Sequence, residues 1–235
     1  MKFLNEMWVL IPARSGSTGL KNKNIKKINN KPLIYYSLES AHKIKKFKKI
    51  IFSSDSDRYI NIAKKYFKNI SIHKRGSKTS SKRASELSVF QDFIKKQKGV
   101  LPKYFAHMRP TSPIRKTSTI NNAIYKFMNI KQKYSSLRTV TEMSDPSYRT
   151  CRIVDGKICS ILRKDFDMQK YWKPRQNFEK TYFGNCIIDI YKTENILNGS
   201  LWGNKIFPYI VKDKTTDIDS MEDFEYSKYL FAQNL

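Results

Sequence analysis

The loop after the first apolar run of the chain combines backbone freedom with positive charge. The run WVLIPA (8–13) is followed by Arg14, Gly16, Gly19 and Lys23. Glycine lets backbone N–H groups approach a ligand closely, and arginine and lysine carry the charge that phosphate oxygens attract. The spacing is neither the G-x-G-x-x-G dinucleotide motif nor a Walker A loop. It predicts an anion-binding turn of another kind, with an ordinary glycine-rich turn as the alternative.

A pair of carboxylates near the C-terminus could bind a cation. If TTDID (215–219) is an extended strand, Asp217 and Asp219 project from the same face. Two adjacent carboxylates repel each other unless a cation or a proton lies between them, and Mg²⁺ is bound by one or two carboxylates together with substrate phosphates. The alternative is a solvated helix start, in which Ser220 caps the helix and Asp223 occupies its third position.

A third polar loop, RPTSPIR (109–115), has two prolines on either side of Thr111 and Ser112. The fixed φ angles of proline make this loop stiff, which suits either a ligand-positioning loop or a structural turn. In an open parallel sheet, ligands bind outside the carboxyl ends of the strands. The loops 12–24, 109–115 and 217–223 are therefore expected to converge on one crevice.

The elements that must position these loops alternate between strand and helix as far as residue 143. Short apolar runs predict buried strands at 8–13, 48–55, 70–73, 104–108 and 135–143. Apolar residues at helical spacing predict helices at 32–44, 56–67, 85–97 and 118–128, of which 56–67 and 85–97 begin at a serine cap. Such alternation indicates βαβ units, and hence an α/β fold with a mostly parallel sheet and helices on both faces.

The alternation stops after residue 143. In the segment 151–162, Asp155–Gly156 is flanked by apolar residues, which predicts a β-hairpin. An irregular stretch is expected at 163–183, strands at 185–191, 207–211 and 215–219, and a closing helix at 220–233. We therefore predict one domain, 1–235, with a hairpin insertion at about 144–183.

The high positive charge of the chain raises the question of a nucleic-acid partner. A net charge of +26 suggests nucleic acid or another anionic surface. Lysine is spread along the whole chain, however, and the clusters at 43–49 and 95–98 fall on separate predicted helices. A general surface enrichment in lysine is therefore favoured, and a nucleic-acid partner is not expected.

The sequence also bears on the compartment. The three cysteines have no C-x-x-C spacing, which favours a reducing compartment such as the cytoplasm. The start MKFLNE has no signal-peptide pattern, and no apolar run reaches the roughly 18 residues needed to span a membrane. A membrane partner is not expected.

Four segments together resemble one family. IPARSGSTGLKNKN, RPTSPIR, RQNFEKTYFGNCIIDIY (175–191) and DIDSMEDFEYSKYL resemble, in the same order, motifs of the cytidylyltransferases that activate sialic acid and related nonulosonic acids. The matches run from residue 8 to about 230. The resemblance implies a three-layer fold of the nucleotide-diphospho-sugar transferase type, in the short form without a C-terminal phosphatase-like domain.

The resemblance also implies a reaction. CTP and a nonulosonic acid would give the CMP-sugar and pyrophosphate in the presence of Mg²⁺, with the anomeric hydroxyl of the sugar attacking the α-phosphate in line. The family implies a homodimer in which the insertion 144–183 packs on the partner and reaches toward its site. The expected partners are therefore CTP, an acidic nine-carbon sugar and a second copy of the chain.

Roles of individual residues follow from the resemblance alone. Residues expected to act in catalysis are Arg14 and Lys23, which hold the triphosphate, and Asp217 and Asp219, which hold Mg²⁺. Residues expected to bind CTP are Ala13, Ser15, Gly16, Ser17, Asn24, Arg75 and Ser85, with Asn24 and Arg75 on the cytidine. Residues expected to bind the sugar are Arg109, Thr111, Ser112, Arg149, Arg175, Gln176, Tyr182 and Asn185, with Arg149 on its carboxylate.

The chain departs from the family pattern at four positions. Thr18 and Lys82 stand where the family has a lysine and an acid, and Cys186 replaces a glycine. Arg109 replaces a glutamine and can only donate hydrogen bonds, so it is expected to pair with a sugar carboxylate or a phosphate. Sugar specificity therefore need not be that of the N-acetylneuraminate enzymes, and a legionaminic-type sugar is one expectation.

Three alternatives stay open at this point. One is another sugar nucleotidyltransferase of the same fold, such as an octulosonate cytidylyltransferase. The second is a basic nucleic-acid-binding module, which would show clustered basic side chains and strongly salt-dependent affinity. The third is a non-catalytic paralogue, to which Thr18 and Lys82 point.

Overall fold

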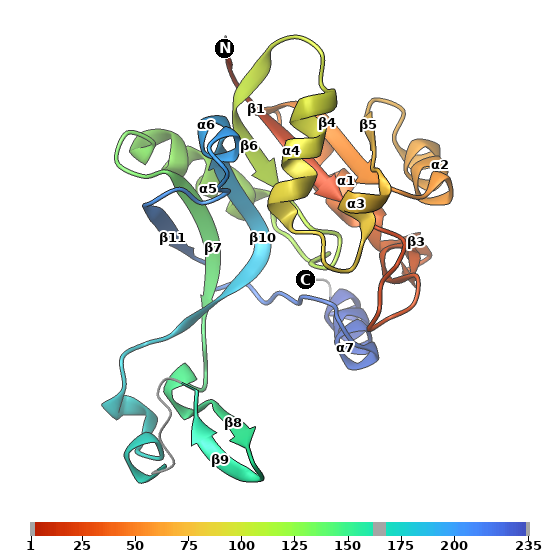
Figure 1. The fold of residues 1–235 in the computed structure, drawn as a ribbon. Coiled ribbons are helices and arrows are strands. Elements are labelled where there is room, and N and C mark those ends of the chain that lie inside the picture. The colour runs from red at the N-terminus through yellow and green to blue at the C-terminus, as the bar shows by residue number, and fades with distance from the viewer. Residues whose placement is uncertain (1–2, 162–167, 234–235) are drawn as a thin grey trace.

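The computed structural model describes residues 3–161 and 168–233 (Figure 1). Its centre is a seven-stranded sheet in the order β11-β7-β10-β6-β1-β4-β5. The strands are β1 (Phe3–Pro12), β4 (Phe47–Ser54), β5 (Ser71–Lys74), β6 (Leu101–His107), β7 (Ser136–Glu142), β10 (Tyr182–Lys192) and β11 (Ile206–Ile210). All pairs are parallel except those of β10, which runs antiparallel to both β6 and β7. The predicted mostly parallel α/β fold is confirmed.

Helices cover both faces of this sheet. The helices are α1 (Leu33–His42), α2 (Asp57–Tyr66), α3 (Ser77–Ser80), α4 (Glu86–Lys96), α5 (Thr117–Ile130), α6 (Thr193–Leu197) and α7 (Met221–Ala232). One hydrophobic core joins the sheet to α1, α2 and α5, and a second joins the opposite face to α4 and α6. The molecule therefore has the three layers that were expected.

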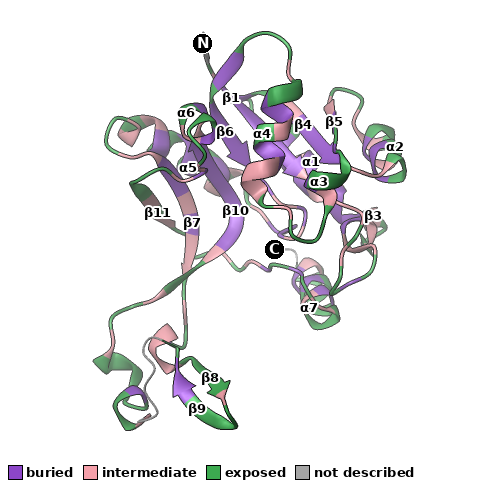
Figure 2. Cartoon of the chain, in the orientation of Figure 1, coloured by how far each residue is buried: buried purple, intermediate pink, exposed green. Residues whose placement is uncertain are grey.

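The central strand β1 shows why the chain folds this way. Its residues alternate between the two cores, with Val9 and Ile11 on one face and Trp8 and Leu10 on the other. A strand buried on both faces must be apolar at every position, which is why WVLIPA reads as a continuous apolar run. Figure 2 shows the buried strands at the middle of the sheet.

Helix starts follow the serine caps. The side chains of Ser56, Ser85 and Ser220 accept hydrogen bonds from backbone N–H groups in the first turns of α2, α4 and α7. Ser220 and Asp223 form a reciprocal capping box, so the alternative role considered for them is present. The short helices α3 and α6 and the two-stranded β2 (Lys27–Ile28) and β3 (Lys31–Pro32) were not predicted.

The strand predicted at 215–219 is wrong. This segment makes no ladder with the sheet, and its backbone is tied to the body by one hydrogen bond, from Ile218 N to the carbonyl of Thr111, 2.8 Å. Four of its five residues are polar and only Ile218 is apolar, so the segment lacks the apolar face that a sheet strand needs. Conversely, β10 begins at Tyr182, so it takes up the end of the stretch expected to be irregular.

The segment between β7 and β10 forms an arm that projects away from the sheet (Figure 1). It contains the hairpin β8 (Cys151–Val154) and β9 (Lys157–Ser160), whose turn residues Asp155 and Gly156 have φ angles of 49° and 73°. These left-handed values match a two-residue hairpin turn, and the predicted hairpin is confirmed. Residues 162–167, namely the last residue of the predicted hairpin segment and the first five of the stretch expected to be irregular, lie outside the described residues. Short 3₁₀ turns flank the hairpin at Ser147–Arg149, Gln169–Tyr171 and Arg175–Asn177.

Within the described part of the chain, none of the helices combines the length and apolarity required to cross a membrane.

Candidate active site

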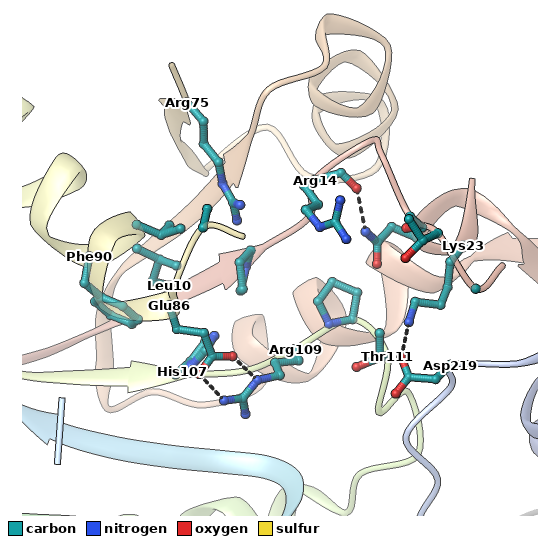
Figure 3. Close-up of a pocket in the computed structure, with 18 residues that line it drawn as sticks. Leu10, Arg14, Lys23, Arg75, Glu86, Phe90, His107, Arg109, Thr111 and Asp219 are labelled. Atoms are coloured by element: carbon teal, nitrogen blue, oxygen red, sulfur yellow. Dashed lines mark hydrogen bonds and ion pairs between the residues drawn. The ribbon is translucent and has the colours of Figure 1, made fainter. Parts of the chain in front are cut away.

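A cavity of about 250 Å³ opens at the carboxyl ends of β1 and β6. Its walls come from the loop after β1, Arg75 after β5, the start of α4, the loop after β6, and Asp219 (Figure 3). The loops 12–24, 109–115 and 217–223 all contribute, so their predicted convergence is confirmed. The segment 75–90 is a further contributor.

The predicted site residues fall into three groups by position. Those that line the cavity are Arg14, Ser17, Lys23, Asn24, Arg75, Arg109, Thr111 and Asp219. Those that do not line it are Ala13, Ser15, Gly16, Ser85, Ser112 and Asp217, which belong to the same segments, and Asn185, which lies in β10. Those on or beside the arm, away from this cavity, are Arg149, Arg175, Gln176 and Tyr182.

The loop after β1 is anchored by an aspartate that the sequence did not single out. The backbone N–H and the hydroxyl of Ser15 both donate to the carboxylate of Asp55, at 2.8 and 2.6 Å. Asp55 directly follows β4, the neighbour of β1 in the sheet. Its position at the end of a predicted strand could have identified it as a residue near the site. Ser15 thus shapes the loop, and its side chain is already occupied.

The same loop packs against the Asp219 segment with little space to spare. A Cβ atom on Gly19 would lie 2.5 Å from the backbone oxygen of Asp219, whereas on Gly16 it would meet only an Arg14 side-chain atom, at 3.4 Å. Lys23 Nζ lies 2.6 Å from Asp219 Oδ1, with the lysine largely buried and the carboxylate 80% exposed. Glycine at 19 is therefore required by a close backbone approach.

Asn24 and Arg75 each carry a buried polar atom without a hydrogen-bond partner among the described residues. Asn24 donates from Nδ2 to the Arg14 carbonyl at 3.0 Å, which leaves its Oδ1 unpaired. On Arg75, Nη2 is unpaired. Both side chains line the cavity and are less than a tenth exposed. Buried polar atoms are costly to leave unpaired, so this acceptor and this donor indicate groups that a ligand supplies.

A buried relay fixes the position of Arg75. Its Nε lies 2.9 Å from Ser53 Oγ, Ser53 Oγ lies 2.9 Å from His73 Nδ1, and His73 Nε2 lies 3.0 Å from Asp92 Oδ2. Because a guanidinium only donates, Ser53 accepts from Arg75 and gives its own proton to His73, whose other nitrogen then donates to Asp92. Burial lowers the pKa of His73, which favours this neutral form. Burial also lowers the pKa of Arg75, to about 10.

Arg109 has other partners than the anion expected for it. Its Nε and Nη2 donate to the two carboxylate oxygens of Glu86, at 2.5 and 2.6 Å, and its Nη1 donates to Asp189 at 2.9 Å. Burial raises the pKa of Glu86, but the neighbouring His107 and Arg109 lower it more, to about 2. Burial likewise raises the pKa of Asp189, against the pull of Arg109. The Arg109 charge is thus balanced within the protein.

His107 and Tyr191 continue this network into the core. The Tyr191 hydroxyl donates to Asp189 Oδ2 at 3.3 Å and lies 3.3 Å from His107 Nδ1. His107 is fully buried, lines the cavity, and its Nε2 has no hydrogen-bond partner within the described residues. Glu86 and His107 were not predicted as site residues, although His107 stands at the carboxyl end of a predicted strand.

The two expected metal ligands lie on either side of the buried Ile218. Both Asp217 and Asp219 are exposed, and Asp217 Oδ2 lies 3.4 Å from the thiol of Cys186. Across the described residues, no three metal-ligating side chains come together. Solvent-facing carboxylates still fit Mg²⁺ when substrate phosphates and water complete its shell, which is how this ion is usually held.

Several other predicted ligand contacts have structural partners. The Ser112 hydroxyl donates to the Asn185 carbonyl at 3.3 Å, and Asn185 Nδ2 donates to Thr141 at 2.9 Å. Ser85 caps α4. On the arm, Arg149 donates to Asp145 at 3.1 Å and to the Lys173 carbonyl.

The sequence of the chain is similar to those of known cytidylyltransferases. Residues 8–195 match the family described as "Cytidylyltransferase". The chain is 32% identical over 220 residues to the N-acylneuraminate cytidylyltransferase of Escherichia coli O18:K1:H7, which covers 92% of this chain but only 50% of that protein. It is 30% identical over 231 residues to the CMP-N,N'-diacetyllegionaminic acid synthase of Campylobacter jejuni, covering 97% and 95% of the two chains.

The fold has also been seen in solved structures. A CMP:2-keto-3-deoxy-manno-octonic acid synthetase complexed with CTP superposes with a TM-score of 0.72 over 98% of this chain and 100% of that one. The two share 14% sequence identity, so this likeness shows the fold alone.

The contact between Gly19 and Asp219 yields a first prediction. Gly19→Ala forces a methyl group against a backbone oxygen, so we expect it to lower the free energy of unfolding by about 1–3 kcal/mol, measured by urea denaturation. Gly16→Ala is the matched control and is expected to change it by less than about 0.5 kcal/mol. Equal effects of the two substitutions would contradict the proposed close approach.

The buried His107 yields a prediction about pH. Burial, together with the charge of Arg109, lowers the pKa of His107 to about 3. Below an ordinary value of about 6.5 the unfolded chain binds a proton that the folded one does not, so stability is lost as the pH falls. From pH 7 to pH 5 the wild-type protein should lose about 2 kcal/mol more unfolding free energy than His107→Gln. If the unfolding free energies of the two proteins fell by the same amount from pH 7 to pH 5, the prediction would be wrong.

Proposed function

Because the chain belongs to the cytidylyltransferase family, we propose that it transfers CMP from CTP to the anomeric hydroxyl of a nonulosonic, sialic-acid-like sugar and releases pyrophosphate. Relatives named for N-acylneuraminate and N,N'-diacetyllegionaminic acid support this class of acceptor. The observation that carries the proposal is a cavity lined by the cations Arg14 and Lys23 and by an unpaired acceptor and an unpaired donor, Asn24 Oδ1 and Arg75 Nη2.

The unpaired atoms suit cytosine. The base presents an amino group that donates and, next to it, a ring nitrogen and a carbonyl oxygen that accept. Asn24 Oδ1 would accept from the amino group, and Arg75 Nη2 would donate to the ring side. Uracil carries an oxygen where cytosine has the amino group, and this oxygen would face the Asn24 oxygen. The pair therefore favours CTP over UTP.

The loop after β1 would hold the triphosphate. Arg14 and Lys23 supply positive charge, and residues 17–19 between them also line the cavity. Lys23 pairs with Asp219, and a phosphate oxygen could replace that carboxylate as its partner. Charge on the departing pyrophosphate would then be stabilised by these two side chains.

Asp217 and Asp219 would hold Mg²⁺ beside the phosphates. A bound Mg²⁺ neutralises phosphate charge and makes the α-phosphate more open to attack. The chain's own contribution is to keep Asp219 in the cavity wall, with Asp217 two residues before it, through the backbone bond of Ile218 to Thr111 and the capping box that starts α7.

We propose further that the enzyme is a homodimer. Arg149, Arg175 and Gln176 belong to the arm, and Tyr182 follows it as the first residue of β10. None of the four lines the cavity of its own chain, so they would serve the site of a partner. Large apolar side chains are exposed on the arm, namely Ile153, Ile158, Ile161 and Trp172, and a partner subunit would cover them. The use of CTP and the sparse cysteines favour a cytoplasmic location.

The role of Asp219 can be tested directly. Asp219→Ala removes a proposed Mg²⁺ ligand, so pyrophosphate release from CTP and a nonulosonic acid should fall by about 1,000-fold or more. Asp57→Ala is a matched control, since Asp57 is also about 80% exposed and ion-paired with a lysine. Release by Asp219→Ala at the wild-type rate, over a panel of sugars and all four nucleoside triphosphates, would remove the metal assignment.

The relay behind Arg75 gives a separate test. Ser53→Ala removes the acceptor of Arg75 Nε, so we expect the KM for CTP to rise about 5- to 10-fold, with the KM for the sugar unchanged. Ser136→Ala is the control, because Ser136 is equally buried and hydrogen-bonded but lies at the other end of the sheet. If both variants moved the KM for CTP alike, the relay would have no special part in nucleotide binding.

A further inference from the structure

One part of the cavity wall presents a carboxylate, whereas Arg14, Lys23 and Arg75 make other parts cationic. Glu86 and Arg109 meet there through two parallel hydrogen bonds, and Asp189 takes a third from the same guanidinium. The Glu86 side chain is 42% exposed, whereas those of Arg109 and Asp189 are 15% and 1% exposed. What this cluster offers to a ligand is therefore mainly a carboxylate.

The Glu86 carboxylate retains hydrogen-bonding capacity in this arrangement. Each of its oxygens accepts one hydrogen bond from Arg109 and has a second lone pair. A carboxylate accepts and cannot donate while it is ionised. Arg109, in turn, is flanked by two carboxyl groups and has no excess charge for an anion. The arginine that stands in the place of a family glutamine thus does not make this wall cationic.

His107 adds a second acceptor to the same wall. The Tyr191 hydroxyl has a single proton, which it gives to Asp189, so its oxygen accepts from His107 Nδ1. The neutral imidazole then carries its proton on Nδ1, and Nε2 is a free lone pair. This Nε2 is buried, has no partner among the described residues, and belongs to a side chain that lines the cavity.

The other groups of the cavity do not compete for this role. In the proposed function, the cytosine amino group is bound by Asn24 Oδ1 and the phosphates lie near Arg14 and Lys23. The apolar side chains of Leu10 and Phe90 lie beside Glu86 and His107 (Figure 3), which suits the body of a ring with a polar substituent. An acceptor-lined wall next to an apolar one is thus left for the second substrate.

We propose that Glu86 and His107 form a subsite for a neutral hydrogen-bond-donating substituent of the acceptor sugar, a hydroxyl or an acylamino N–H, and that Arg109 is a positioning residue that holds Glu86. The proposal rests on the proposed function. It also assigns the sugar's carboxylate elsewhere, because an anion at this wall would face Glu86 at close range.

The test compares Glu86→Gln with the wild-type enzyme. The probes are N-acetylneuraminate and N,N'-diacetyllegionaminate with CTP, and the readout is pyrophosphate release. Loss of the charged acceptor should raise the KM for the better of the two sugars about 10- to 100-fold and leave the KM for CTP within about twofold. Glu225→Gln, which breaks an exposed ion pair with Lys228 on α7, is the matched control and should change neither constant.

The positioning role of Arg109 is tested by a double-mutant cycle. Arg109→Gln should raise the KM for the sugar because Glu86 is no longer held. The KM for the sugar of the double variant Glu86→Gln/Arg109→Gln should not exceed that of the single variant with the higher KM. Additive effects would overturn the coupling. Circular dichroism and thermal unfolding check the fold of each variant. If Glu86→Gln is poorly folded, Glu86→Asp takes its place. This variant keeps the charge, so its KM for the sugar should lie between the wild-type value and the rise of about 10- to 100-fold expected for Glu86→Gln.

The outcomes are distinct. An active wild-type enzyme whose Glu86→Gln variant keeps its KM for the sugar overturns the subsite while the proposed function stands. A rise in the KM for CTP alone assigns the wall to the nucleobase and overturns the acceptor assignment. Absence of turnover by the wild-type protein with either sugar, with CTP binding retained by calorimetry, refutes the proposed function and the subsite with it.

Discussion

The site depends on how two largely buried arginines of one loop, Arg109 and Arg115, find partners for their N–H groups. A buried guanidinium is costly unless its charge is paired and its N–H groups are bonded. Arg109 meets this need with carboxylates from α4 and β10. Arg115 meets only the second part of it: its N–H groups donate to the carbonyls of Cys186, Ile187 and Arg109 and to the hydroxyl of Ser37, and these hydrogen bonds include no carboxylate. The loop 109–115 is thereby bonded to α1, α4 and β10 at once.

Much of the fold could be predicted because local patterns carry it. The apolar runs and serine caps gave the order of strands and helices, and that order alone brings the loops after β1 and β6 to one edge of the sheet. The antiparallel β10 could not be placed in the sheet order, because its pairing with β6 and β7 depends on contacts between residues far apart in sequence. The segment 215–219 was expected to be a strand but lies outside the sheet, because an extended pattern alone does not supply a strand partner.

The site was predictable where chemistry and position coincide, as at Arg14, Lys23 and Asp219. It was not predictable where a role depends on a distant partner. Nothing near Glu86 in the sequence indicates that it pairs with Arg109, 23 residues on. In the same way, the relay from Asp92 to Arg75 passes through Ser53 and His73, which come from two different strands. Such networks are set by tertiary packing, which composition and spacing do not encode locally.

The distribution of charge inside the cavity can orient the substrates. The chain as a whole carries a formal charge of +26, yet its cavity is not uniformly basic. Arg14 and Lys23 lie toward one part of the wall, and the acceptors Glu86 and His107 lie toward another (Figure 3). A triphosphate is attracted to the first and repelled by the second, so a nucleotide can enter in only one favourable direction. In the proposed function this direction leaves the acceptor-lined wall to the sugar, and the attacking hydroxyl and the α-phosphate meet between the two regions.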